Sequence, residues 1–75
     1  MVTVGVDLHQ QTSQIAVLRD EGRLTQRRLA NAATRLGRFF HGLPRARVAI
    51  EASGTWWWLV DLLEGLGHQP ECPLS

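Results

Sequence analysis

The sequence contains no lysine, only one cysteine and no long run of hydrophobic residues. Because Cys72 is the only thiol, an internal disulfide and a cysteine-based zinc cluster are excluded. No apolar run approaches the roughly 18 residues of a membrane-spanning helix. The first residues also lack the basic segment and apolar stretch of a signal peptide. These absences predict a cytoplasmic protein with no membrane partner.

All eight positively charged side chains are arginines, and the formal net charge is +1. A net charge this small indicates no particular partner. Guanidinium groups form planar forks that match phosphate oxygens, which favours contact with nucleic acid. A chain rich in arginine, alanine and glycine also results from the codon usage of a GC-rich genome. The lack of lysine leaves both explanations open.

The composition, with 44% hydrophobic and 20% charged residues, is typical of a globular protein and not of a disordered one. A chain of 75 residues forms at most one small domain. Folding at this size buries only about 60% of the surface that the unfolded chain exposes. We therefore expect marginal stability.

Hydrophobic periodicity predicts an α/β fold with the element order β-β-β-α-β-α-β. The predicted strands cover residues 2–8, 14–18, 23–29 and 46–50, with a fifth strand over 68–72. Gly22 supplies the positive φ of a hairpin between the second and third strands. Three meandering strands followed by helix-linked strands predict a mixed sheet, in which a right-handed crossover puts the fourth strand beside the first.

Two helices are predicted from apolar residues at helical spacing. The first has Asn31 or Thr34 as its N-cap and ends at Gly42 and Pro44; the second has Thr55 as its N-cap and ends at Gly67. The apolar stripe of the first helix is Leu36, Phe39, Phe40 and Leu43. The stripe of the second is Trp56, Leu59, Val60, Leu63 and Leu66, with Trp57 and Trp58 projecting to either side.

Two carboxylates, Asp7 and Glu51, lie at the ends of the first and fourth predicted strands. If these strands are parallel neighbours, both acids share one edge of the sheet, where α/β folds bind ligands. Adjacent carboxylates repel each other and are stabilised by a cation, and oxygen ligands suit Mg²⁺ or Mn²⁺. The alternative is structural: Asp7 then caps the turn near Gln10 and Gln11, and Glu51 caps the second helix.

The segments VGVDLHQQTSQIAVL and VAIEASGTWWWLVDLL, separated by an acidic-glycine hairpin, resemble the start of the DEDD transposases of the IS-one-ten insertion-sequence family. The resemblance covers roughly residues 2–70. Asp7 matches the family's first catalytic acid and Glu51 its second. The N-terminal domain of that family is similar to the RuvC resolvase, so the resemblance implies an RNase-H-like fold over residues 1–75.

The family resemblance implies metal-dependent breakage and joining of DNA strands in transposition, with Mg²⁺ as the usual ion. It also implies a structured RNA partner and a C-terminal domain that contributes a serine. The family pattern requires two further aspartates, which Asp61 and Glu64 do not replace because they lie on the outer face of the second helix. We therefore interpret the chain as the N-terminal portion of such a transposase, which is inactive alone. The sequence leaves open whether it forms a homo-oligomer.

Several other side chains have both a functional and an ordinary interpretation. His9 either reaches a scissile phosphate or ends its strand in solvent, and Thr12 and Ser13 either contact phosphate or are ordinary turn residues. The three tryptophans either stack on bases or pack in the core or against another domain. The hairpin arginines either contact a nucleic-acid backbone or protect a sheet edge from aggregation. These arginines are Arg19, Arg23, Arg27 and Arg28.

Two other classes of function compete with the transposase. An ATP-binding domain of the actin, sugar-kinase and heat-shock-protein class also opens with a strand, an aspartate, a turn and a hairpin. Its turn is typically glycine-rich, so that backbone amides cradle phosphate, whereas residues 8–11 here are LHQQ. A binding module without catalytic activity is the third interpretation.

Overall fold

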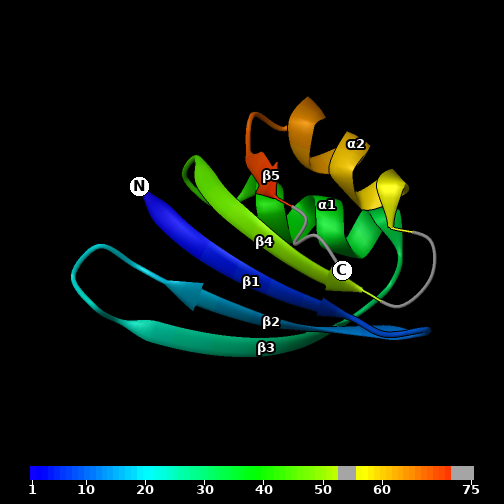
Figure 1. Ribbon diagram of the computed structural model, residues 1–75, viewed down its shortest axis with the longest axis horizontal. Helices are drawn as coiled ribbons and strands as arrows, with labels where there is room; N and C mark the ends of the chain where they lie inside the picture. Colours follow the sequence, from blue (N-terminus) through cyan, green and yellow to red (C-terminus); the bar gives the residue numbers. More distant parts are fainter. Residues whose placement is uncertain (53–55, 72–75) are drawn as a thin grey trace.

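The computed structural model describes residues 1–52 and 56–71 as an α/β domain with one five-stranded mixed sheet and two helices (Figure 1). The strands are β1 (Val2–Leu8), β2 (Thr12–Leu18), β3 (Leu24–Ala30), β4 (Ala46–Ala52) and β5 (Gln69–Glu71). The helices are α1 (Ala33–His41) and α2 (Trp57–Gly65). No helix of the described part is long and apolar enough to cross a membrane.

The strand order is β3-β2-β1-β4-β5, which confirms the predicted mixed sheet with the fourth strand beside the first. Strands β1, β2 and β3 pair antiparallel as a meander, and Gly22 has the positive φ of +85° expected in the β2–β3 hairpin. Helix α1 carries the chain from β3 back to β4, which pairs parallel with β1. Strand β5 then pairs parallel with β4.

One face of the sheet is buried beneath both helices, and the other is open. Strands β1 and β4 bury every second residue, because alternate side chains of a strand point to opposite faces. Leu36 and Phe40 of α1 and Leu59 and Leu63 of α2 complete the core. The buried strand residues include Val2, Val4, Val6, Leu8, Ile15, Val17, Ala46, Val48 and Ile50. Asp7 and Glu51 have the opposite parity and lie on the open face, as predicted.

Gly42 ends α1 and Gly67, with a positive φ, follows the end of α2 as predicted, but the N-cap residues of both helices differ from the prediction. Helix α1 begins after Ala32, and no side chain caps it, because Asn31 bonds to the β1–β2 turn instead. The N-cap position of α2 is Trp56, again without a side-chain cap, while Thr55 lies outside the described residues. Trp56 is 38% exposed, so its predicted place in the apolar stripe is wrong.

His68 links the helical layer to the sheet at the start of β5. Its ring is 5% exposed, and its Nδ1 accepts a hydrogen bond of 3.0 Å from the backbone N–H of Ala46. The other ring nitrogen, Nε2, lies 2.8 Å from the carbonyl oxygen of Phe40 and donates to it. A ring nitrogen that accepts cannot carry a proton, so these partners select the neutral tautomer with hydrogen on Nε2. Nothing in the spacing of the histidines predicted this role.

Candidate functional site

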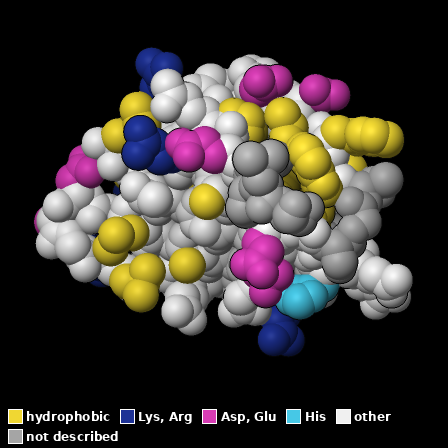
Figure 2. Space-filling model, viewed as in Figure 1, with side chains coloured by type: hydrophobic (Ala, Val, Ile, Leu, Met, Phe, Trp, Pro, Cys, Tyr) yellow, Lys and Arg dark blue, Asp and Glu magenta, His cyan; other side chains and the backbone are white. Residues whose placement is uncertain are grey.

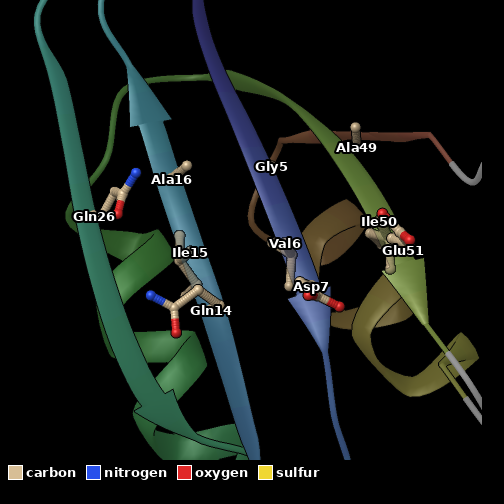
Figure 3. Close-up of a pocket in the computed structure, with 10 residues that line it drawn as sticks. All are labelled: Gly5, Val6, Asp7, Gln14, Ile15, Ala16, Gln26, Ala49, Ile50 and Glu51. Atoms are coloured by element: carbon tan, nitrogen blue, oxygen red, sulfur yellow. The ribbon is translucent and has the colours of Figure 1, made fainter.

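Asp7 and Glu51 lie side by side at the carboxyl ends of β1 and β4. They are register partners across the parallel pair, and neighbouring strands in a sheet are about 4.7–4.9 Å apart. Both side chains are exposed on the open face, the Asp7 side chain to 53%. Figure 3 shows them projecting from adjacent strands. The predicted juxtaposition of the two acids is therefore confirmed.

A row of polar side chains continues from the two acids across the open face. Gln14 of β2 is the register partner of Asp7, and Arg28 of β3 is the register partner of Gln14. The Nε atom of Arg28 donates a 3.3 Å hydrogen bond to Gln14 Oε1. The order Glu51–Asp7–Gln14–Arg28 thus places two acids, an amide and a cation in one line across four strands.

Small residues form the floor beside this row. Gly5, Ala16 and Ala49 are neighbours in register on β1, β2 and β4, two residues away from the polar row along each strand. Because none has a side chain longer than a methyl group, the sheet surface is open there. The resulting hollow has a volume of about 360 Å³, and both Asp7 and Glu51 line it (Figure 3). A ligand can therefore approach both carboxylates from this face.

His9 is the nearest polar neighbour of Asp7. Its Nε2 lies 3.2 Å from Asp7 Oδ2, and the side chain is 62% exposed. A smaller hollow is lined by Asp7, His9 and Glu51, with Leu8 and Ala52. Acidic side chains and a histidine lie together in the lower part of Figure 2. His9 therefore lies in solvent at the end of β1 and also contacts Asp7, and its contact with a scissile phosphate stays a prediction.

Asn31 anchors the turn that carries His9. Its side-chain amide donates to the carbonyl oxygen of His9, and its Oδ1 accepts a hydrogen bond from the hydroxyl of Ser13. The Asn31 backbone N–H donates to the carbonyl oxygen of Gln11 at 2.9 Å. Ser13 is fully buried within β2, so it is not available to contact phosphate. Sequence reasoning missed the role of Asn31 because its partners lie 18 and 22 residues away.

Asp7 and Glu51 provide carboxylate oxygens, the type of ligand that Mg²⁺ and Mn²⁺ prefer. Among residues 1–52 and 56–71, no group of three or more His, Cys, Asp or Glu side chains is placed to hold a metal. Mg²⁺ commonly binds through one or two carboxylates and keeps several waters, so Asp7 and Glu51 match this donor set. Zinc instead requires about three or four nitrogen, sulfur or oxygen ligands from the protein. The donor chemistry therefore suits Mg²⁺ or Mn²⁺.

The structural alternative for the two acids has no support among the described residues. No side chain caps α2, which excludes Glu51 from that role. The Asp7 carboxylate contacts His9, and none of the side-chain hydrogen bonds in the described part of the chain joins it to the amides of Gln10 or Gln11. Two exposed carboxylates without a structural task thus lie next to each other.

The four hairpin arginines do not form one surface. Arg27 and Arg28 are consecutive residues of β3, so they point to opposite faces of the sheet. Arg28 joins the polar row, whereas the guanidinium Cζ of Arg27 lies 5.6 Å from the ring centroid of Phe39 in α1. Arg19 and Arg23 flank the hairpin turn, where the Arg19 N–H donates to the Arg23 carbonyl at 2.9 Å. Their contact with nucleic acid stays a prediction.

The three tryptophans have unequal environments. Trp57 is 68% exposed, whereas Trp58 is partly buried and packs against the core. Trp56 is 38% exposed at the N-terminal end of α2. Interior packing therefore describes Trp58, and the side chain of Trp57 is left largely in solvent.

Comparison of the chain with models of known protein families and with curated proteins finds no match.

Proposed function

We propose that this chain is the N-terminal part of an RNase-H-like DEDD transposase domain, which breaks and joins DNA strands with the help of a divalent metal ion. The observation that carries the proposal is the register of β1 and β4, which pairs Asp7 with Glu51 on an open sheet face. The mixed sheet with order β3-β2-β1-β4-β5 supports the fold part of the proposal.

Each residue of the edge has a distinct task under this proposal. Asp7 and Glu51 provide carboxylate oxygens for Mg²⁺ or Mn²⁺. His9, at 3.2 Å from Asp7 Oδ2, orients that carboxylate. A bound metal ion would supply electrostatic stabilisation for the charge that develops on phosphodiester oxygens. The low floor of Gly5 and Ala49 allows a nucleic-acid backbone to approach the acids without a steric clash.

The family pattern contains two further aspartates that this sequence does not match. Two carboxylates can hold a hydrated ion, but they leave its coordination incomplete for catalysis. We therefore expect metal binding without robust cleavage from these 75 residues. Incubation with plasmid DNA and Mg²⁺ tests this expectation. Cleavage abolished by Asp7→Asn would show that two acids suffice.

Paramagnetic Mn²⁺ provides the decisive test of the metal site. Titration into the isotope-labelled chain should broaden the amide signals at the ends of β1 and β4 before any others. Asp7→Asn and Glu51→Gln should each abolish this selective broadening. Asp61→Asn, which removes an exposed acid of α2, is the matched control and should leave it unchanged. Broadening centred on another acid, or unaffected by both edge variants, would refute the proposal.

A further inference from the structure

A second surface, on the helix-covered side of β3, has the properties of an anion-binding site. Arg27 of β3 and Arg35 and Arg38 of α1 line a hollow of about 680 Å³ between the strand and the helix. The other lining residues are Leu29, Phe39, Gly42 and Leu43. None of these residues lines the hollows next to Asp7 and Glu51. The arginine hollow is therefore separate from the acidic edge.

The positive charge of the arginine hollow is not neutralised by neighbouring acids. Residues 22–50 contain no aspartate or glutamate, although every arginine except Arg19 lies in this segment. The ion pairs among the described residues join Met1 to Asp20, His9 to Asp7 and Arg47 to Glu71, and none involves an arginine of the hollow. Arg27, Arg35 and Arg38 are thus exposed, line one concave surface and make no ion pair with an acid among the described residues.

The aromatic contact inside the hollow indicates which anion fits. The Arg27 guanidinium lies 5.6 Å from the Phe39 ring centroid, and Phe39 is held edge-on against the buried Phe40 at a centroid distance of 5.2 Å. Phe40 thus supports the Phe39 ring, and Arg27 and Phe39 form a cation–π pair whose two members both line the hollow. Nucleobases stack on guanidinium planes and aromatic rings, whereas the Asp and Glu side chains of an acidic peptide have no aromatic face that stacks on such a pair.

We infer that the hollow of Arg27, Arg35 and Arg38 binds the phosphodiester backbone of a single-stranded nucleic acid, with a base stacked at the Arg27–Phe39 pair. Arg35 and Arg38 are three residues apart on α1 and lie on the same side of the helix. Their guanidinium groups can each donate two hydrogen bonds to oxygens of successive phosphates. The volume of the hollow falls within the roughly 300–1,000 Å³ of sites that enclose a small organic ligand.

Binding of short fluorescent single-stranded DNA and RNA, measured by anisotropy in EDTA, tests this site without a metal ion at the acidic edge. The double variant Arg27→Gln/Arg38→Gln should weaken binding by about tenfold or more. A plot of the logarithm of the binding constant against the logarithm of the salt concentration should also become less steep, by about 0.7 for each arginine removed. The matched control, Arg23→Gln/Arg45→Gln, removes the same charge from the same segment outside the hollow and should retain most of the affinity. The DNA and RNA arms identify which strand is preferred.

Amide chemical shifts of the unaltered chain provide a readout that does not depend on how the variants fold. Adding the preferred oligonucleotide should shift signals of β3 and α1. Arg27→Lys, which keeps the charge but removes the planar fork, should weaken nucleic-acid binding more than it weakens binding of inorganic phosphate. Equal losses in both double variants, shifts confined to other elements, or equally strong displacement by polyglutamate would overturn the inference. Failure of the Mn²⁺ test would leave this measurement in EDTA unaffected.

Discussion

Asp7 and Glu51 are register partners on β1 and β4, two parallel strands at the centre of the sheet. Like charges on directly opposite residues of neighbouring strands are destabilising. The sheet tolerates the pair because both side chains reach solvent on the open face and the His9 ring lies 3.2 Å from the Asp7 carboxylate. Such a pair raises the energy of the folded state unless a cation binds, and this property leads to the first prediction.

Removing one of the paired charges should stabilise the metal-free protein. We expect Glu51→Gln to raise the free energy of unfolding by about 0.2–1 kcal/mol in EDTA, the range for interactions between paired residues of neighbouring strands. With Mg²⁺ at tenfold its dissociation constant, the unaltered chain should gain about 1.4 kcal/mol, whereas the variant should gain none. Urea denaturation with and without Mg²⁺ measures both effects. Glu64→Gln, which alters an exposed acid of α2, should leave the free energy of unfolding in EDTA unchanged and should keep the full gain with Mg²⁺. A Glu51→Gln variant that is less stable than the unaltered chain in EDTA would disprove the repulsion.

Asn31 should be essential for the turn between β1 and β2. Asn31→Ala removes the partner of the buried Ser13 hydroxyl and the donor to the His9 carbonyl. A buried polar group that loses its partner costs about 1–3 kcal/mol, so we expect a decrease of that size in the free energy of unfolding. Chemical denaturation measures it. Gln10→Ala, in the same turn and exposed, should cost much less, and equal losses would show that Asn31 is not the anchor.

His68 should stabilise the fold through its two ring nitrogens and not through its volume. His68→Phe keeps an aromatic ring but removes the acceptor for the Ala46 N–H and the donor to the Phe40 carbonyl. The unpaired amide should cost about 1–3 kcal/mol. The comparison is with His41→Phe, which alters an exposed histidine at the end of α1. A neutral effect of His68→Phe in denaturation experiments would mean that packing alone determines this position.

Exposed apolar surface on α2 should cause self-association. Trp57 is 68% exposed, so Trp57→Gln should change the free energy of unfolding by no more than about 0.5 kcal/mol. The same variant should show less self-association in sedimentation velocity and less binding of an apolar dye. Leu59 is fully buried, and Leu59→Ala should cost about 2–5 kcal/mol. A strictly monomeric chain with a sharp thermal transition at high temperature would show that this surface is harmless and that the small core suffices.

The amino-acid sequence by itself determined the type and order of the elements, because these depend on local periodicity. Alternation in VTVGVDL and ARVAIEA assigns Asp7 and Glu51 to the face opposite the valines and isoleucine, and the crossover rule makes the two strands neighbours. Gly22 and Gly67 both have the positive φ that a turn and a helix end require. The position of Asp7 and Glu51 side by side at one edge of the sheet was therefore predictable from the sequence.

Only the tertiary structure decided which partners the isolated polar residues have. The sequence predicts Asn31 as a helix cap, yet its side chain bonds to Ser13 and His9, which lie 18 and 22 positions earlier. No role is predicted for the His68 side chain, yet its ring bonds to the backbone of both Ala46 and Phe40. The hairpin arginines looked like one cluster, but strand alternation separates Arg27 from Arg28, and helix α1 supplies the other arginines near Arg27. The physical reason is the same in each case. Local patterns fix the face on which a side chain lies, whereas its partners come from distant segments that meet only when the sheet and helices pack.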